Sequence, residues 1–380
     1  MIKVLHCADI HLDTPFNCPD KQKSETRRAE LRGTFTSMML YAKTNKIDIM
    51  LIAGDLFDME FVTRETVALV LREFAANPYC RFVISPGNHD PYGEDRVYAK
   101  TDFPENVYIF ENSQLCYFSF DDVGPDHDSV DVYGYAFTSP TMKFNPFAMK
   151  NPKNPSHINL LCGHGDMHSP ISPTCPITVD DIKNSRFDYI ALGHIHNSSG
   201  IERIGDTWYG YSGCLEGRSQ NETGYKGAIV AEISKSSGVA TVNAKGVRFS
   251  KRRCENETVN VTGAALQEEV AEHIGAMLNE KRYGTDTSLK VTLEGDVSSK
   301  LVMNKKQLEA QFAPGLFRIE IVDRTLPLYD YDTFENDPTI RGALFEQLLP
   351  KLQSGTPEER ATASEALRIA LSAISGGEIV

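Results

Sequence analysis

The sequence lacks any long run of apolar residues. Its longest apolar stretches, such as Ile49–Ala53 and Ile158–Cys162, fall far short of the roughly 18 residues that a membrane-spanning helix needs. The N-terminal segment Met1–Phe16 carries charged and imidazole side chains where a secretory signal would need an unbroken apolar core. We therefore expect no transmembrane helix, no membrane partner and a cytoplasmic location.

Paired cysteines and an excess of basic charge are also absent. The eight cysteines are scattered without a C-x-x-C pair, which fits neither a zinc ribbon nor a disulfide framework, so most should be reduced, buried thiols. The chain has 39 Lys and Arg against 52 Asp and Glu, a net charge of −13. This excludes a polycation that coats nucleic acid by bulk attraction, so any polyanionic substrate must be held by local features.

The length and composition are those of a folded protein with more than one core. Hydrophobic residues make up 41% and charged residues 24% of the 380 residues, with only 27 Gly and 19 Pro, which excludes a disordered or fibrous chain. A single core rarely supports this length. We expect one large domain of about 250 residues and something smaller.

Short β-rich runs alternate with helical patterns over the first part of the chain, which predicts a layered α/β domain. Helices are predicted over residues 24–44 and 63–77, between the first three strands. After residue 77 the predicted strands follow one another mostly without helices, so the second half of the sheet system should be antiparallel or mixed. Two sheets packed face to face, with helices outside, would fit this pattern.

The pattern changes near residues 251–256. The elements predicted beyond this point are a helix at 264–282, a strand at 288–294, a helix at 304–312, a strand at 316–322, and two helices at 339–352 and 357–375. The second of the two final helices begins with a capping box, Thr356 to Glu359, with Pro at its first position. The expected division is a core over 1–250, a small α/β accessory domain over 251–325, a linker over 326–338 and C-terminal helices over 339–380 that dock on a partner.

Five short stretches share one layout, in which a β-rich run ends and residues typical of metal ligands follow at once. They are Cys7-Ala8-Asp9-Ile10-His11, Gly54-Asp55-Leu56-Phe57-Asp58, Gly87-Asn88-His89-Asp90, Gly163-His164-Gly165-Asp166 and Gly193-His194-Ile195-His196, and they hold five of the ten histidines. Strand ends face the crevice in which sheet proteins bind ligands. One such stretch alone would be an ordinary loop, but the five together favour a shared metal site.

The ligand types are oxygen and imidazole without thiolate, which favours Mn, Fe, Zn or a similar ion over Ca or Mg alone. Seven residues are candidate ligands, enough for two ions if Asp55 bridges them: Asp9, His11, Asp55, Asn88, His164, His194 and His196. Two ions roughly 3.5 to 4 Å apart suit phosphoester hydrolysis. His89 is then left to donate a proton or to stabilise the transition state.

Other polar residues of these stretches have weaker assignments. His168, close to His164, is an alternative ligand. Four carboxylates could either orient the ligands or simply form turns: Asp13, Asp58, Asp90 and Asp166.

The ordered set of motifs resembles the calcineurin-like metallophosphoesterases. Three stretches, Leu5–Asp13, Ala53–Asp58 and Asp188–His196, are similar to the DNA-repair exonuclease branch of that family, which includes SbcD-like nuclease subunits. Tyr211–Gly227 is similar to the YhaO-like subgroup of the same branch. The resemblance covers about residues 1–235.

The resemblance implies a four-layer α-β-β-α sandwich with a small α/β capping domain and C-terminal helices. It implies one ion held by Asp9, His11, Asp55 and His196, and another held by Asp55, Asn88, His164 and His194, with manganese as the usual ion and iron, zinc or magnesium as alternatives. His89 matches the catalytic histidine and Asp90 its orienting partner. Some members carry His where this chain has Asp58.

The same resemblance implies the activity and the partners. It implies a metal-dependent DNA nuclease, exonuclease or endonuclease, that acts in DNA repair. The implied partners are an SbcC-like coiled-coil ATPase, bound through the C-terminal helices, and a second copy of the chain, bound through helices near the start of the core.

Two basic runs are candidates for DNA contact. The first consists of Lys245, Arg248, Lys251, Arg252 and Arg253, and the second of Lys21, Lys23, Arg27, Arg28 and Arg32. Either run could instead be a solvated face, and the second could serve dimer contacts. Aromatic residues do not alternate with these basic residues as in a base-stacking platform, so we expect contact with the DNA backbone without sequence preference.

Two other classes of function are open to such a chain. A small-molecule or cyclic-nucleotide phosphodiesterase could use the same metal core, but the roughly 130 residues after the core argue against it. A non-enzymatic scaffold for an ATPase would have a degenerate site, whereas each expected ligand position holds a competent residue.

Overall fold

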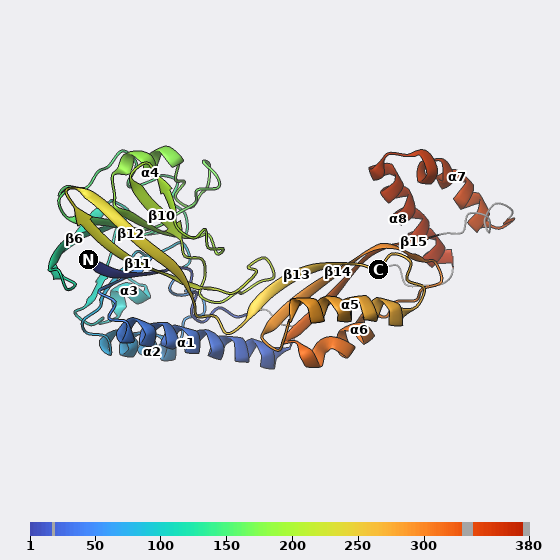
Figure 1. The fold of residues 1–380 in the computed structure, drawn as a ribbon, viewed down its shortest axis with the longest axis horizontal. Helices are drawn as coiled ribbons and strands as arrows, with labels where there is room; N and C mark the ends of the chain where they lie inside the picture. The colour runs from blue at the N-terminus through green and yellow to red at the C-terminus, as the bar shows by residue number, and fades with distance from the viewer. Residues whose placement is uncertain (17–19, 329–336, 375–380) are drawn as a thin grey trace. The chain divides into compact units, whose positions relative to one another are not determined.

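Three β-sheets organise the chain (Figure 1). The coordinates are a computed structural model that describes residues 1–16, 20–328 and 337–374. Outside these residues lie Cys18, most of the linker expected over 326–338 and the end of the expected C-terminal helices. By its internal contacts the chain divides into two units, Met1–Arg253 and Cys254–Val380.

The first sheet has six strands and is mixed. In sheet order they are β12 (Val239–Arg248), β11 (Gly227–Ser236), β1 (Ile2–Cys7), β2 (Ile49–Ile52), β3 (Arg81–Ile84) and β4 (Val107–Ile109). Strands β1 to β4 are parallel, and β11 pairs antiparallel with both β1 and β12. Strand β2 is buried at all four positions, as expected for a parallel strand that is covered on both faces.

The second sheet also has six strands and is mixed. In sheet order they are β5 (Cys116–Val123), β6 (Asp128–Gly134), β7 (Ile158–His164), β8 (Tyr189–Gly193), β10 (Thr207–Tyr211) and β9 (Glu202–Ile204). The four central strands are parallel and the two edge strands antiparallel. The prediction of a second sheet with antiparallel or mixed pairing is confirmed.

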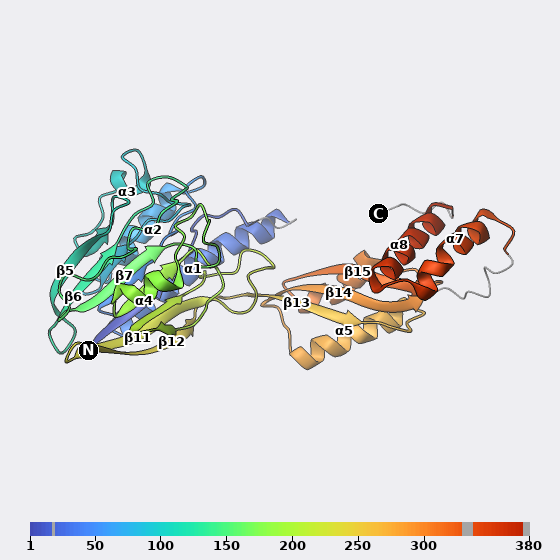
Figure 2. The same cartoon turned by 90° about the horizontal axis from the view of Figure 1, so that it is seen from above.

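Two helices cover one face of the first sheet (Figures 1 and 2). They are α1 (Lys21–Thr44) and α2 (Arg64–Ala75), and both are capped by side-chain oxygens, of Asp20 and Thr63 respectively. Leu31 and Phe35 of α1 and Phe74 of α2 belong to one apolar cluster with the outer face of the sheet. Both helices lie within a few residues of their predicted ranges.

The two sheets share an apolar interior. A single buried cluster contains Val4 and Leu51 of the first sheet together with Val132, Leu160 and Ala191 of the second. The outer face of the second sheet packs against the short helix α4 (Val179–Ser185). A one-turn helix, α3 (Val97–Lys100), precedes β4.

The second unit is a small α/β structure with its own core. It comprises β13 (Arg253–Asn260), α5 (Gln267–Lys281), β14 (Thr287–Ser298), α6 (Lys305–Phe312), a 3₁₀ turn (Ala313–Gly315) and β15 (Arg318–Leu328). Strands β14 and β15 are parallel, and Val270, Leu289 and Leu308 are fully buried. The sequence patterns indicated both helices and the last two strands but missed β13, because its apolar positions alternate only weakly with charged ones.

The chain continues into two helices, α7 (Ile340–Ser354) and α8 (Pro357–Ile374). Their shared cluster is small, with Phe345 and Leu367 as its buried members. The predicted capping box is present, since Glu359 accepts from the Thr356 N–H and Thr356 accepts from the Glu359 N–H. Within the described residues, no helix is both long enough and apolar enough to cross a membrane.

We expect Gly193→Ala to lower the midpoint of thermal unfolding, Tm. The added Cβ would lie 1.8 Å from the carbonyl oxygen of Ala53 and 2.8 Å from the Cβ of Ala8, and overpacking typically costs about 1–3 kcal/mol. Gly246→Ala is the matched control, because a Cβ there meets nothing within 4 Å. Equal Tm values for the two variants in a calorimetric melt would contradict this close approach.

Candidate metal centre

The ends of five strands bring the candidate ligands together. Asp9 and His11 follow β1, Asp55 follows β2, and Asn88 and His89 follow β3, all in the first sheet. His164 ends β7, and His194 and His196 follow β8, its neighbour in the second sheet. The two sheets therefore supply the ligands from the carboxyl ends of parallel strands, where α/β proteins place their sites.

The backbone at these positions is strained. The φ angles of Asp9, His11, Asp55 and His194 are 51°, 48°, 53° and 99°, in a region that costs a non-glycine residue about 1–3 kcal/mol. Hydrogen bonds between loops hold this conformation, with the N–H of Asp9 donating to Gly54 O at 3.1 Å and that of His11 to Asp55 O at 2.9 Å. Strain of this kind concentrates at functional sites.

Asp90 fixes the loops that follow β2 and β3. Its carboxylate accepts the backbone N–H groups of Asp55 at 3.1 Å, Phe57 at 3.1 Å and Gly87 at 2.7 Å. It also accepts the hydroxyl of Tyr98 at 2.5 Å. Burial, with the charge of Asp55 adding to it, raises the pKa of Asp90 to about 6. Asp90 thus supports the ligand loops from within the core.

A first group of ligand atoms comes from Asp9, His11 and His196, all within 4.8 Å of one another. Both ring nitrogens of His11 are buried without a hydrogen-bond partner among the described residues, and Nε2 lies 3.5 Å from Asp55 Oδ2. Burial lowers the pKa of His11 well below its usual value, so the ring is neutral. An orphaned, neutral imidazole beside carboxylates is what a divalent cation would satisfy.

A second group comes from Asp9, Asp55 and His164, again within 4.8 Å. Nδ1 of His164 lies 3.0 Å from Ala53 O and must donate to it, which leaves Nε2 as an acceptor. Nε2 nevertheless faces two oxygens, Asn88 Oδ1 at 2.8 Å and Asp55 Oδ2 at 3.4 Å. Three acceptors that face one another favour a cation between them, so these residues also fit a metal ion.

Gly54 makes room for this second group. Its φ is +90°, and a Cβ there would lie 2.2 Å from Nδ1 of His164. A larger residue would displace the imidazole from Ala53 O and from Asp55.

Burial raises the pKa of Asp55 to about 6, whereas the charge of His89 lowers it, and a bound cation would lower it further.

His194 lies beside the second group and has its own partner. Its Nε2 is 3.0 Å from Thr174 Oγ1, its backbone N–H donates to both oxygens of Asp9 at 3.1 Å, and its ring meets that of His164 edge-on at 5.2 Å. Burial, with the charge of His164, lowers the pKa of His194 to about 4. His194 thus lies next to the second group without being one of its three members.

His89 stands at the open side of the centre and faces Asp58. Its side chain is 47% exposed, and Nδ1 lies 3.8 Å from Asp58 Oδ1. The interaction with Asp58 raises the pKa of His89 and lowers that of Asp58. Asp58 thus faces the imidazole, a place that the sequence assigned to Asp90. His11, Asp58 and His89 also form a third group of ligand atoms within 4.8 Å.

The remaining acidic and imidazole candidates are placed away from these groups or engaged elsewhere. Asp13 accepts from Thr63 and Thr66 at the start of α2 and from Arg32. His168 is exposed, and its backbone N–H donates to Asp166. Asp13 thus stabilises the start of α2, and the contact between His168 and Asp166 stabilises a turn.

Two charged residues at the centre had no role in the sequence predictions. Glu222 accepts from His196 Nδ1 at 2.6 Å, and Arg218 Nη2 lies 3.0 Å from the same nitrogen. Both fall within residues 211–227, which stood out only for their resemblance to a subgroup. Neither follows a strand end, so the pattern that identified the ligands could not identify them.

Much of the basic charge is already paired inside the first unit. Arg252 binds Glu30 through two hydrogen bonds of 2.7 and 2.6 Å and is 17% exposed, and Arg248 and Arg253 lie over the ring of Tyr225. Lys245 and Lys251 are exposed. In the second basic run, Arg27 pairs with the buried Glu216 and Arg32 with Asp13.

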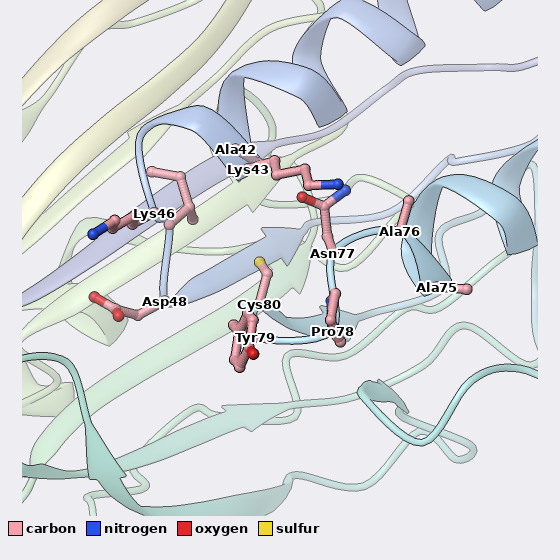
Figure 3. A pocket seen from close by; sticks show the side chains of 11 residues that line it. Ala42, Lys43, Lys46, Asp48, Ala75, Ala76, Asn77, Pro78, Tyr79 and Cys80 are labelled. Atoms are coloured by element: carbon pink, nitrogen blue, oxygen red, sulfur yellow. The ribbon is translucent and has the colours of Figure 1, made fainter.

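A cavity of about 770 Å³ lies away from the ligands, at the opposite ends of β2 and β3 (Figure 3). Asp48, which lines it, precedes β2, and Asn77 and Cys80 precede β3, whereas Asp55 and Asn88 follow the other ends of these strands. Its mostly apolar lining contains none of the candidate ligands, so the cavity is not part of the metal centre.

Comparisons with known proteins agree with this geometry. Residues 2–198 match the model of the calcineurin-like phosphoesterases. The chain is 26% identical over 360 residues to "Uncharacterized metallophosphoesterase YhaO" of Bacillus subtilis, which covers 90% of this chain and 86% of that protein. It is 24% identical over 261 residues to the SbcD component of the nuclease SbcCD of Staphylococcus epidermidis, which covers 61% of this chain and 66% of that protein.

We expect Asp58→Asn to shift the alkaline limb of phosphoester hydrolysis to lower pH. Asp58 raises the pKa of His89, so the wild-type imidazole keeps its proton to a higher pH than the variant imidazole would. The two enzymes should therefore differ most where the variant His89 has lost its proton and the wild-type His89 has not. The measurement is kcat against pH, with Mn²⁺, on a small chromogenic phosphodiester. Asp206→Asn, at a fully exposed position, is the control, and coincident alkaline limbs would contradict the pairing.

Proposed function

This chain belongs to the calcineurin-like phosphoesterase family, and from that premise we propose that it is a metal-dependent DNA nuclease with a dinuclear centre. The observation that carries the proposal is the pair of ligand groups that share Asp9 between them, with Asp55 3.5 Å from His11 and 3.4 Å from His164. The Asp55 carboxylate, which faces an imidazole of each group, can bridge two ions. The relative named as part of a nuclease supports DNA as the substrate.

The proposed ligand sets are those that the family resemblance implies, and each contains residues of one of the two groups. Asp9, His11, Asp55 and His196 would hold one ion, and Asp55, Asn88, His164 and His194 the other, with manganese as the proposed metal in a four-layer α-β-β-α core. Two such ions, when bound, lower the pKa of a water molecule and neutralise charge that develops on phosphate oxygens. The burial that lowers the pKa of His11 and His164 favours this binding, because a metal ion binds the neutral imidazole.

His89 is the proposed proton donor. Its half-exposed ring stands next to His11, with ring centroids 4.8 Å apart, and its backbone N–H donates to Asp55 Oδ1 at 2.9 Å. Asp58 raises its pKa and so favours the protonated imidazole. That proton would pass to the leaving oxygen, a transfer that typically contributes about 10² to 10⁴-fold.

The second unit has two proposed roles. Residues 251–325 would act as a capping domain that helps to hold DNA. The hairpin of α7 and α8 would bind a coiled-coil ATPase, as its small core and its exposed apolar residues suggest; Ile340, Ile369 and Ile374 are 68%, 36% and 41% exposed. A homodimer through the first helices is also proposed, since Leu40 of α1 is 62% exposed.

Purified protein with Mn²⁺ should cleave labelled single- or double-stranded DNA and also a chromogenic phosphodiester. Asp55→Asn should abolish both activities, because it removes a carboxylate that faces both ligand groups. His89→Gln should keep its bound metal, measured by elemental analysis, while turnover falls about 10² to 10⁴-fold. Cleavage of the small ester without cleavage of DNA would instead favour a small-molecule phosphodiesterase, and metal loss in His89→Gln would make His89 a ligand.

Replacing Lys245 and Lys251 together by Glu should weaken DNA binding more than it slows the small ester. Both side chains are exposed, and DNA phosphates remote from the ions add affinity that a small ester lacks. The log-log salt slope should become shallower by about 0.9 for each lost phosphate contact on duplex DNA. Arg252→Glu is unsuitable, because it would break the pair with Glu30.

The matched control replaces Lys143 and Lys150, which are also exposed, by Glu. This double change alters the net charge equally. If both double variants showed the same salt slope as the wild type, Lys245 and Lys251 would be a solvated face rather than a DNA contact.

A further inference from the structure

Three charged side chains from one loop contact His196, and we call them the His196 clamp. They are Arg218, Glu222 and Lys226. Glu222 Oε1 lies 2.6 Å from Nδ1 of the imidazole, and Arg218 Nη2 lies 3.0 and 3.2 Å from Nδ1 and Nε2. Lys226 Nζ donates to the carbonyl oxygen of His196 at 3.3 Å and to Asn197 at 2.6 Å.

Glu222 is itself fixed in place. It is buried, and its second oxygen accepts the backbone N–H groups of Arg218 and Ser219. The first oxygen accepts none of these backbone groups and is the acceptor for His196 Nδ1.

This contact determines which ring nitrogen is free. When Nδ1–H donates to Glu222, the lone pair of His196 lies on Nε2, which is 3.7 Å from Asp9 Oδ1. Nε2 is then the nitrogen that faces the first ligand group. A carboxylate that accepts from the second nitrogen of a metal-binding histidine raises the basicity of the ligand and fixes its orientation.

Nη2 of Arg218 lies over a face of the ring and does not block that lone pair. An atom nearly equidistant from both ring nitrogens would collide with the carbon between them if it lay in the ring plane, so Nη2 must lie over the face. The Arg218 side chain is 17% exposed, and its Nε is buried without a partner among the described residues. Nη2 lies 3.2 Å from His196 Nε2, the nitrogen that faces Asp9, so Arg218 is close to the first ligand group.

The two residues before Arg218, Glu216 and Gly217, are hydrogen-bonded to α1. Glu216 is buried and accepts from Thr34 at 2.7 Å and from Arg27 at 3.1 Å, and Arg27 also donates to Gly217 O at 2.7 Å. Arg218 is therefore preorganised. A preorganised guanidinium can give two parallel N–H donors to a phosphate.

We propose that Glu222 is the positioning residue that presents His196 Nε2 to the first ion, and that Arg218 is a further substrate-binding residue that contacts the non-bridging oxygens of the phosphodiester. The inference rests on the proposed function for its substrate class. Its first half concerns only the ligand histidine and can be tested without any substrate.

Titration with Mn²⁺ alone tests Glu222. In Glu222→Gln the acceptor shape remains but the charge is lost, so one of the two ions should bind about 10–100-fold more weakly while the affinity of the other stays at its wild-type value. His196→Ala should weaken the same ion, and Glu280→Gln, exposed on α5, should weaken neither. Wild-type affinities in Glu222→Gln would overturn the assignment, as would an equal loss of both ions with a lower Tm.

Substrate kinetics tests Arg218. Arg218→Met should raise KM for the chromogenic phosphodiester, and the inhibition constant of inorganic phosphate, by about tenfold or more with Mn²⁺ affinity retained. Arg218→Lys should recover part of this loss because it keeps the charge without the planar fork. Arg203→Met, at a position that is 46% exposed, is the control. An unchanged KM and unchanged phosphate inhibition would overturn this role.

Different results would contradict the proposed function, the role of Arg218 and the role of Glu222. A wild-type protein that binds two Mn²⁺ ions but cleaves neither DNA nor the small ester would contradict the proposed function, and it would also overturn the role of Arg218. The role of Glu222 would still be decided by the Mn²⁺ titration. A wild-type protein that binds no Mn²⁺ would overturn both.

Discussion

Burial of polar ligand groups is the constraint on which the first unit depends. Asp9, His11, Asp55 and His164 are all 1% exposed or less, and a buried polar group without a partner costs about 1–3 kcal/mol. Burial also lowers the pKa of the imidazoles, so they stay neutral and keep a lone pair. The same burial that leaves these polar groups costly without a cation therefore creates a set of neutral nitrogens and carboxylates suited to bind one.

The ligands can be buried in this way because a second set of groups holds the strained loops. Asp90 offers its carboxylate to the backbone on both sides of Asp55 and to the loop after β3, and Glu222 does the same for His196 and residues 218–219. Both carboxylates are buried and accept hydrogen bonds from the loops that carry the candidate ligands. Positive φ angles at Asp9, His11 and Asp55 persist only when the surroundings determine them. The Asp90 carboxylate fixes the backbone at Asp55, and backbone hydrogen bonds to Gly54 O and Asp55 O fix it at Asp9 and His11.

The sequence could indicate the residues that the strand ends bring together, but only some of the groups that support them, for a physical reason. Asp9, Asp55, Asn88, His164 and His194 each follow or end a strand, and parallel strands align their ends, so periodicity and turn residues are enough to bring them to one edge. Support contacts depend instead on how loops fold. Glu222 meets His196 through a loop without regular structure, and Asp58 rather than Asp90 faces His89 although both belong to predicted motifs.

The same distinction applies to the basic residues and limits where DNA can be attracted. Arg252 pairs with Glu30, 222 positions earlier in the chain, and Arg27 pairs with Glu216; clusters of Lys and Arg in the sequence cannot reveal such pairs. These pairs use basic charge internally in a protein of net charge −13. The proposed nuclease would draw its anionic substrate by the positive charge of its centre, where bound divalent ions would exceed the charge of the Asp9 and Asp55 carboxylates, and by cations beside it. Arg218, which contacts His196 and lies 3.8 Å from Glu222 Oε1, is one of these cations. Substrate affinity should therefore depend on the local geometry of the His196 clamp rather than on the overall charge.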